Sequence, residues 1–283
     1  MTKTAIALTA LTRRLVLGST AGGVAVYSTY KAHYDPIHLV WDLDNTLLCS
    51  VTPIPRDSST SASTRINDFL VYDSFDQIDD DFPSDAIANN TRTYWRPGAR
   101  TALKLCSLFA VQHIYTTAQG TYTENILKQL DKNGINRSVF HTIIHRGIAP
   151  ASVKNGKDLR LIVEDIDNKK RGRQQESSLL HRMILFDDRT NNFTPQEGRN
   201  GAHVLSFDVA VVNKEPNDVA DDNNNATTLV PITFIDWWRE GTEVARLVAI
   251  SMLAFWIPGD VRDTVLPMVR TQQHKERFPT TGK

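Results

Sequence analysis

Short apolar runs separated by polar turns predict buried strands in the middle of the chain. Residues 37–41, 111–115 and 183–186 are mainly apolar and too short for typical helices. Each run ends abruptly in polar residues. This pattern is typical of strands that are covered on both faces, as in a parallel sheet.

Between these runs, apolar residues recur at helical spacing. The turn Arg96-Pro97-Gly98 predicts the start of one helix, and Thr121 with Glu124 fits the capping box of a second, which Gly134 would end. The apolar positions are Ala102, Leu105, Cys106 and Phe109 in the first helix, and Ile126, Leu127 and Leu130 in the second. Strand and helix alternate, so we predict an α/β fold of Rossmann type, with a central parallel sheet flanked by helices.

The remaining segments set the domain limits. Residues 50–91 are polar and acidic around a candidate strand at 69–75, and predict a β-rich insertion after the first strand. Residues 244–256 are nearly all apolar but too few to span a bilayer, so we expect a buried terminal helix. The folded domain would cover residues 35–260, with a flexible tail at 261–283.

The N-terminal segment, residues 1–34, differs in composition from the rest. It contains no acidic residue but has Lys3, Arg13, Arg14 and Lys31. This composition is typical of a mitochondrial presequence or a short membrane anchor, and the Arg pair also fits a bacterial twin-arginine signal. The apolar part is shorter than the roughly 20 residues of a comfortable membrane span. Mitochondrial targeting or anchoring is the preferred interpretation.

Charge and cysteine content exclude other classes. The chain has 32 basic and 32 acidic residues, so bulk charge gives no reason to expect a nucleic-acid partner. Its two cysteines, Cys49 and Cys106, fit a reduced compartment and provide no disulfide framework.

Polar side chains follow all three predicted strands. They are Asp42 and Asp44 after the first, Thr116 after the second, and Asp187 with Asp188 after the third. The carboxyl ends of parallel strands share one edge, where such folds place their ligands. Clustered carboxylates favour a hard cation such as Mg²⁺, and the helix that opens after Thr116 offers backbone N–H groups to a phosphate. Lys157 is a candidate to neutralise that phosphate and keep Asp42 ionised.

Taken together, these motifs resemble a known superfamily. The motifs are Asp42-Leu-Asp44-Asn-Thr46-Leu, Arg96-Pro97-Gly98, Tyr115-Thr116-Thr117-Ala118 with Tyr122, Lys157-Asp158-Leu159 and Ile184-Leu-Phe-Asp187-Asp188. In this order they resemble the haloacid-dehalogenase-like (HAD-like) superfamily, over residues 37 to about 210. The likeness is narrower to the branch of RNA polymerase II carboxyl-terminal-domain phosphatases. That branch includes small nuclear-envelope phosphatases and the phosphatase-like subunit of the mitochondrial inner-membrane import translocase.

The resemblance implies a fold without a large cap domain and a Mg²⁺-dependent phosphatase that works through an aspartyl-phosphate. Asp42 would be the nucleophile and a metal ligand, and Asp44 the acid and base, with its backbone carbonyl on the metal. Asp187 would complete the metal site. Thr116 and Lys157 would bind the phosphate, while Asp188 and Thr46 would lie behind these groups and orient them.

Three functions follow as expectations. The first is a phosphatase of protein phosphoserine or phosphothreonine, with a phosphoprotein as its substrate. The second is a membrane-tethered import-translocase subunit that binds presequences and has little or no phosphatase activity. The third is a phosphatase of small metabolites. We expect membrane association, at the mitochondrial inner membrane or else at the nuclear envelope or ER, with membrane-bound regulatory or translocase subunits as partners.

Overall fold

The computed structural model describes Ser28, Lys31 and residues 35–51, 92–132, 137–170, 179–194, 198–207, 211–213, 227–229 and 234–269. The N-terminal segment, residues 1–34, therefore lies outside the described residues apart from Ser28 and Lys31. The predicted insertion is described only at residues 50 and 51, and the predicted tail only as far as residue 269.

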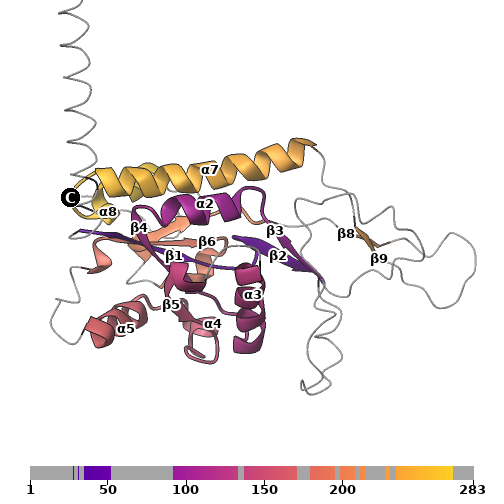
Figure 1. Ribbon diagram of the computed structural model, residues 1–283, viewed down its shortest axis with the longest axis horizontal. Helices are drawn as coiled ribbons and strands as arrows, with labels where there is room; N and C mark the ends of the chain where they lie inside the picture. The colour runs from indigo at the N-terminus through magenta and orange to yellow at the C-terminus, as the bar shows by residue number, and fades with distance from the viewer. Residues whose placement is uncertain are drawn as a thin grey trace, which may run out of the picture.

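A five-stranded parallel sheet forms the centre of the fold (Figure 1), as the sequence predicted. Its strand order is β5-β4-β1-β6-β7. The strands are β1 (Ile37–Trp41), β4 (Ala110–Tyr115), β5 (Phe140–Ile144), β6 (Met183–Asp187) and β7 (Gly201–His203). Strands β1, β4 and β6 match the three apolar runs, whereas β5 and β7 were not predicted. The first strand is the central one, with β4 and β6 as its neighbours.

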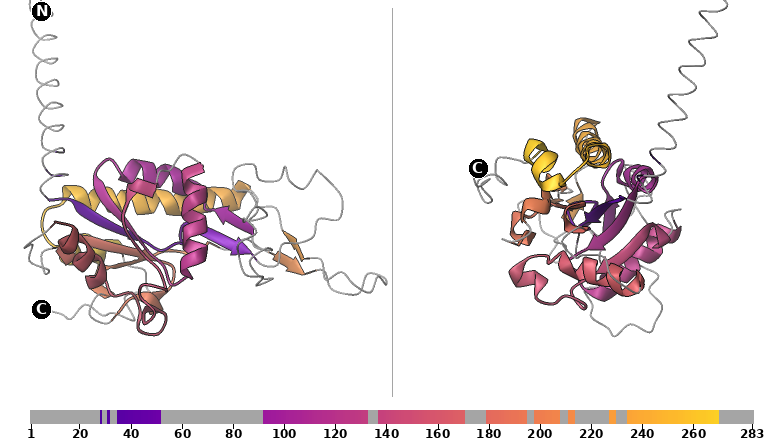
Figure 2. Two further views of the ribbon diagram at one scale, coloured as in Figure 1. Left: turned by 60° about the horizontal axis from the view of Figure 1, so that its bottom comes forward. Right: turned by 90° about the vertical axis from the view of Figure 1, so that its left-hand side faces the viewer.

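Alternate residues of β1 enter two different cores, which is why four of its five residues are apolar. Leu39 and Trp41 belong to the core built with α2 (Ala99–Cys106) and α7 (Phe234–Trp256). Val40 belongs to the second core, formed with α5 (Arg160–Lys170). Figure 2 shows α7 and α5 on opposite sides of the sheet. The domain therefore has three layers, helix on sheet on helix.

Both predicted helices are present, but the buried face of the first and the starting residue of the second differ from the prediction. Helix α2 buries Ala99, Ala102, Leu103 and Cys106, while Leu105 is 46% exposed, so the predicted face was wrong at that position. Helix α3 (Gly120–Lys132) begins before Thr121, which places that residue inside the helix and not at its cap. Ile126 and Leu127 are buried, as predicted. The remaining short helices are α4 (Ser152–Asn155), α8 (Val261–Thr264) and α9 (Leu266–Val269).

Two antiparallel ribbons stand apart from the main sheet. Strands β2 (Leu48–Val51) and β3 (Arg92–Trp95) pair with each other and flank residues 52–91, which are not described. The predicted insertion thus leaves and re-enters the domain through one ribbon. The other ribbon joins β8 (Val211–Asn213) to β9 (Thr227–Leu229).

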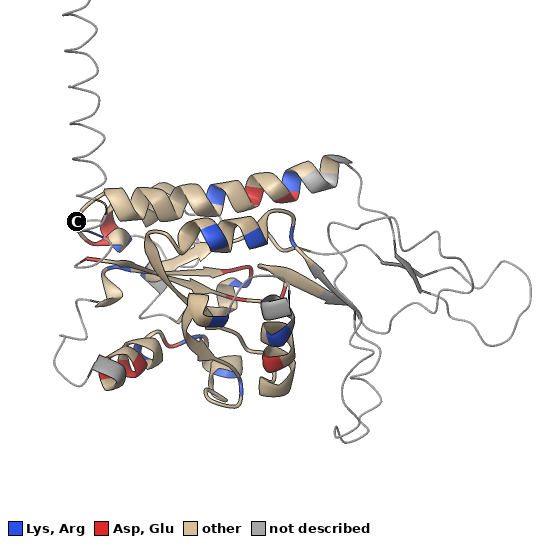
Figure 3. Cartoon of the chain, viewed as in Figure 1, with Lys and Arg blue, Asp and Glu red and all other residues tan. Residues whose placement is uncertain are grey.

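Helix α7 is longer than the apolar run 244–256 that predicted it. Its charged residues gather in the first half and its second half is apolar (Figure 3). Val244, Leu247, Ile250 and Ala254 enter the core, whereas Trp256 is 40% exposed. Within the described part of the chain, no helix combines the length and apolarity needed to cross a bilayer. Residues 261–269, which the sequence placed in the tail, form α8 and α9 and bury three further apolar side chains.

Candidate active site

The two central strands deliver carboxylates to the same edge of the sheet. Trp41 pairs with Phe186 in the parallel ladder, and the N–H of Asp42 donates to the carbonyl of Phe186 at 3.0 Å. Asp42 and Asp187 are therefore neighbours at the point where β1 and β6 end. Asp42 is 4% exposed and Asp187 is fully buried.

A tight loop follows Asp42 and fixes its direction. Three consecutive N–H groups, those of Thr46, Leu47 and Leu48, donate to the carbonyl of Leu43. Asn45 has a φ of 59°, in the left-handed region that Asn tolerates better than most residues. The loop turns the chain back at once into β2, so the first carboxylate stays at the strand end.

Lys157 reaches this edge from a distant segment and lies between the two acids. Its Nζ is 2.5 Å from Asp42 Oδ1 and 2.6 Å from Asp187 Oδ2, and the side chain has no exposed surface. Gly156 precedes it with a φ of 85°, and the N–H of Lys157 donates to the carbonyl of Asn192 at 2.6 Å. The structure thus brings together the Lys and the Asp residues that the sequence selected separately.

Asp187 is held by further donors that the sequence did not single out. The N–H of Arg189 donates to Oδ1 at 2.8 Å, and Nδ2 of Asn192 lies 2.9 Å from Oδ1 and 3.0 Å from Oδ2. Asn192 is buried. In the sequence, Asn192 is marked only by its position five residues after Asp187. In the structure it ends the short 3₁₀ turn Thr190–Asn192.

The carboxyl groups at this edge have perturbed pKa values. Burial raises the pKa of Asp42 well above its ordinary range, and the ion pair with Lys157 opposes that rise. Burial and then the neighbouring Asp187 raise the pKa of Asp188 to about 6. Burial alone would lower the pKa of Lys157, but Asp187 and Asp42 outweigh burial and the net shift is upward. Such shifts are typical of functional sites.

Asp44 points to a different partner from Asp42. The hydroxyl of Tyr122, in the first turns of α3, donates to Asp44 Oδ1 at 2.5 Å. Burial raises the pKa of Asp44, and the Tyr122 hydrogen bond opposes the shift. The sequence included Tyr122 in a motif but gave it no role.

Thr116 lies at the end of β4, buried beside the same edge. Its N–H donates to the carbonyl of Ile144 at 2.9 Å, and its Oγ1 accepts from the N–H of Ala118 at 3.1 Å. The hydroxyl therefore shapes the turn between β4 and α3. Its O–H can still be donated, because it is used here as an acceptor.

Three carboxylates lie close enough together to share one cation. Oxygens of Asp42, Asp187 and Asp188 are all within 4.8 Å of one another. Asp188 Oδ1 is buried and has no hydrogen-bond partner among the described residues, so it is available as a ligand. With Lys157 as the counter-charge, the ionised cluster carries a surplus of two negative charges. Hard oxygen donors with this charge fit a divalent cation such as Mg²⁺.

The cluster differs in composition from the one that the resemblance implied. Asp188 was expected behind the metal, yet its carboxylate is within the group. Asp44, which the resemblance assigned to the metal through its backbone carbonyl, contributes no side chain to the group. Thr46 lies behind Asp188, since its Oγ1 accepts from the Asp188 N–H at 3.1 Å.

The parallel sheet with this Asp–Lys cluster at its carboxyl edge defines a HAD-like domain of phosphatase type. More particularly, the chain belongs to the NLI interacting factor-like phosphatases, whose family model matches residues 37–223. This span begins at β1 and includes every candidate site residue. The predicted superfamily and branch are therefore confirmed.

The fold of one solved structure agrees with this assignment. The structure of Fcp1, an essential RNA polymerase II CTD phosphatase, matches with a TM-score of 0.50 and 15% identity, over 86% of this chain and 72% of that one. A variant of the fission yeast Fcp1 bound to beryllium fluoride gives a TM-score of 0.48 and 13% identity, with the same coverage. No curated protein matches the sequence.

Proposed function

We propose that the chain is a Mg²⁺-dependent phosphatase that acts through an aspartyl-phosphate, on phosphoserine or phosphothreonine in proteins. The observation that carries this proposal is the buried ammonium of Lys157 between Asp42 and Asp187, with Asp44 turned toward Tyr122. The two aspartates of one loop thus have separate environments. Separate environments allow one carboxyl group to attack while the other transfers a proton.

Asp42 is the nucleophile in this mechanism. A carboxylate oxygen of Asp42 attacks phosphorus, and the bond between phosphorus and the ester oxygen breaks. Burial disfavours the ionised form of Asp42, and Lys157 favours it. A divalent cation held by Asp42, Asp187 and Asp188 would supply further positive charge to the phosphoryl oxygens.

Asp44 handles the proton. Its raised pKa favours a protonated carboxyl group, which can give its proton to the departing alkoxide. The same carboxylate then accepts a proton from water as that water attacks the aspartyl-phosphate. Phosphate leaves and Asp42 is regenerated. The Tyr122 hydroxyl fixes Oδ1 of Asp44 and leaves the other oxygen for the proton transfer.

Binding of the phosphoryl group falls to Lys157 and Thr116. Nζ of Lys157 supplies positive charge, and Thr116 supplies a hydroxyl at the end of β4. Loss of a single such donor costs about 2.7–4 kcal/mol of transition-state stabilisation in other enzymes. The preference for a protein substrate rests on the family and on the likeness to a polymerase phosphatase, and is therefore an analogy.

The test is hydrolysis of an aryl phosphate, a phosphoserine peptide and a sugar phosphate by the full chain, with and without Mg²⁺. We expect Mg²⁺-dependent turnover of the first two that is lost in Asp42→Asn. The control is Glu124→Gln, an isosteric change in an exposed ion pair with Arg137. Full activity of Asp42→Asn would refute the mechanism. Turnover of the sugar phosphate alone would show a metabolite phosphatase.

A second function is favoured by the N-terminal composition. Residues 1–34 contain basic residues but no acid, which supports a tethered subunit of the mitochondrial import machinery that binds presequences. The two functions are compatible in one protein. Fusion of residues 1–34 to a fluorescent reporter tests the targeting, and a uniformly cytosolic signal would remove its main support.

A further inference from the structure

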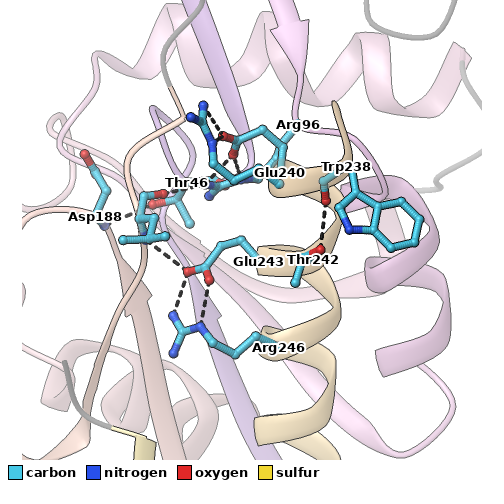
Figure 4. A network of polar contacts seen from close by, with 10 residues as sticks. Thr46, Arg96, Asp188, Trp238, Glu240, Thr242, Glu243 and Arg246 are labelled. Atoms are coloured by element: carbon cyan, nitrogen blue, oxygen red, sulfur yellow. Dashed lines mark hydrogen bonds and ion pairs between the residues drawn. The ribbon is translucent and has the colours of Figure 1, made fainter. Parts of the chain in front are cut away.

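Helix α7 contacts the loops of the site through a buried pair, Arg96–Glu240, and a partly buried pair, Glu243–Arg246, in which the Arg246 side chain is 31% exposed (Figure 4). Arg96 belongs to the turn that precedes α2, and the other three residues lie on α7. Arg96 has no exposed side-chain surface, and the side chain of Glu240 is 7% exposed. Ionised side chains are seldom buried to this degree unless they are paired.

The guanidinium of Arg96 joins three segments. Its Nε and Nη2 donate to Glu240 Oε2 at 3.0 and 2.8 Å, which ties it to α7. Its Nη1 donates to the carbonyl of Thr46 at 2.9 Å, and Nη2 also donates to the carbonyl of Leu205 at 2.5 Å. One side chain thus connects α7 to the loop after β1 and to the segment after β7.

The second pair, Glu243–Arg246, forms hydrogen bonds with the end of β7 and the segment that follows it. Glu243 Oε1 accepts from the N–H of Leu205 at 3.0 Å, and Arg246 Nη2 donates to the carbonyl of His203 at 2.9 Å. Hydrogen bonds from Arg246, together with the Leu205 N–H, outweigh burial and lower the pKa of Glu243. The ring of His203 in turn lies 2.9 Å, through Nε2, from the carbonyl of Asp188.

Both connections end at the site. Thr46, whose carbonyl is bound by Arg96, accepts the Asp188 N–H through its hydroxyl. The N–H of Phe207 donates to the carbonyl of Asn45 at 2.7 Å, on the residue with left-handed backbone. The loop with Asp42 and Asp44 and the turn with Asp188 are therefore both fixed from α7.

We propose that Arg96 and Glu240 are positioning residues for catalysis, which set the loop of Asp42 and Asp44 against Asp188 and so tune metal affinity and turnover. This proposal deepens the proposed function and rests on it. Neither residue lies in the carboxylate cluster, so each acts through Thr46 and the segment after β7. Helix α7, far from the motifs in sequence, becomes part of the catalytic apparatus.

Two physical arguments favour positioning over stability alone. Two charges removed from water lose hydration free energy that their attraction barely restores, and apolar residues of similar volume often replace such pairs without loss of stability. What an apolar pair cannot supply is the planar fork of donors by which Arg96 binds a carboxylate and two carbonyls at once. In other enzymes, displacement of a reacting group by about 1 Å lowers the rate by about 100-fold.

The experiment compares Glu240→Gln, Arg96→Lys and the double variant Arg96→Met/Glu240→Met with wild type. Each protein is examined by thermal unfolding, by phosphopeptide kinetics well below its Tm, and by calorimetric titration with Mg²⁺ in the absence of substrate. We expect the double variant to unfold close to the wild-type Tm while kcat falls by about 100-fold and Mg²⁺ binds at least several-fold more weakly. Glu124→Gln, in the exposed pair with Arg137, should match wild type in all three.

Recovery of wild-type kcat and Mg²⁺ affinity in the double variant would overturn the proposal, because the pair would then serve stability only. Should wild type bind Mg²⁺ but turn over no phosphopeptide, the proposed function fails, and the titration still decides whether Arg96 and Glu240 organise the metal site. If the double variant does not fold, Arg96→Lys supplies the test, since Lys keeps the charge but not the fork. Unchanged kcat and Mg²⁺ affinity in a folded Arg96→Lys would refute positioning.

Discussion

Replacement of Lys157 by Met should strongly destabilise the metal-free protein. The ammonium is fully buried and lies 2.5 and 2.6 Å from two carboxylates, one of which is fully buried as well. Met retains most of the apolar length of the side chain, so the change removes charge more than packing. Asp42 and Asp187 would then face each other without a cation between them.

The magnitude follows from the burial. Removal of one partner from a buried ion pair costs about 3–5 kcal/mol, because the remaining charge stays desolvated and uncompensated. For a domain of this size, each kcal/mol corresponds to a shift in Tm of about 2–4 °C. The expected loss in Tm is therefore about 6–20 °C. Added Mg²⁺ should restore part of it, by about 2.7 kcal/mol at a concentration 100 times its Kd.

The assay is thermal and urea unfolding of wild type and Lys157→Met, each with EDTA and then with Mg²⁺. Lys154→Met is the matched control, because Lys154 is exposed on the neighbouring α4 and should change the Tm by little. A loss below about 1 kcal/mol in EDTA would contradict the reasoning, since the carboxylates would then not need a cation between them.

Three further changes test other features of the structure. Gly156→Ala should destabilise the protein more than Gly98→Ala. Both glycines have positive φ, but only at Gly156 would an added Cβ lie 2.9 Å from a carbonyl oxygen, that of Asn192. Urea unfolding of the two variants measures the difference. Asp260→Ala should cost about 1 kcal/mol at neutral pH, because Asp260 caps α8. Burial raises the pKa of Asp260, but hydrogen bonds from Arg262 outweigh burial and lower the pKa. The stabilisation by Asp260 is therefore complete above about pH 4 and is lost as the pH falls through the folded-state pKa. Equal urea midpoints of wild type and Asp260→Ala at pH 7 would contradict this prediction. Burial raises the pKa of the Cys106 thiol to about 12, so iodoacetamide at pH 8 should alkylate Cys106 only after denaturation. Mass spectrometry of the treated protein detects the label.

The elements with strong local signals could be predicted from the sequence. Strands β1, β4 and β6 are mainly apolar because both of their faces are covered, although the polar residues His38, Gln112 and His113 are buried in them as well. Their ends carry Asp42, Thr116 and Asp187, and a parallel sheet places such ends at one edge. Lys157 was selected by its short motif, and the structure places its ammonium against two of the acids.

Features that depend on contacts between distant segments could not be predicted. Strand β5 reads Phe140–Ile144 with an exposed residue at its second position, and it follows a polar turn that gives no strand signal. The N-terminal half of α7 is charged, so the apolar run located only the second half. The role of Glu240 could not be predicted, because its partner Arg96 is distant in the sequence and only the fold brings the two side chains together. The role of Asp188 was inferred from family pattern, whereas its carboxylate position depends on the turn after β6.

The distance in sequence between Arg96 and Glu240 has a consequence for biosynthesis. A ribosome releases the loop of Asp42 long before α7, and at about 5–20 residues per second the interval is about 10–40 seconds. During that time the nascent chain carries the whole aspartate motif without the helix that holds it. Strand β1 is likewise synthesised well before β6, with which it pairs on one side. A chain that ends prematurely before α7 would therefore display every catalytic motif and still lack the support that its catalytic loop needs.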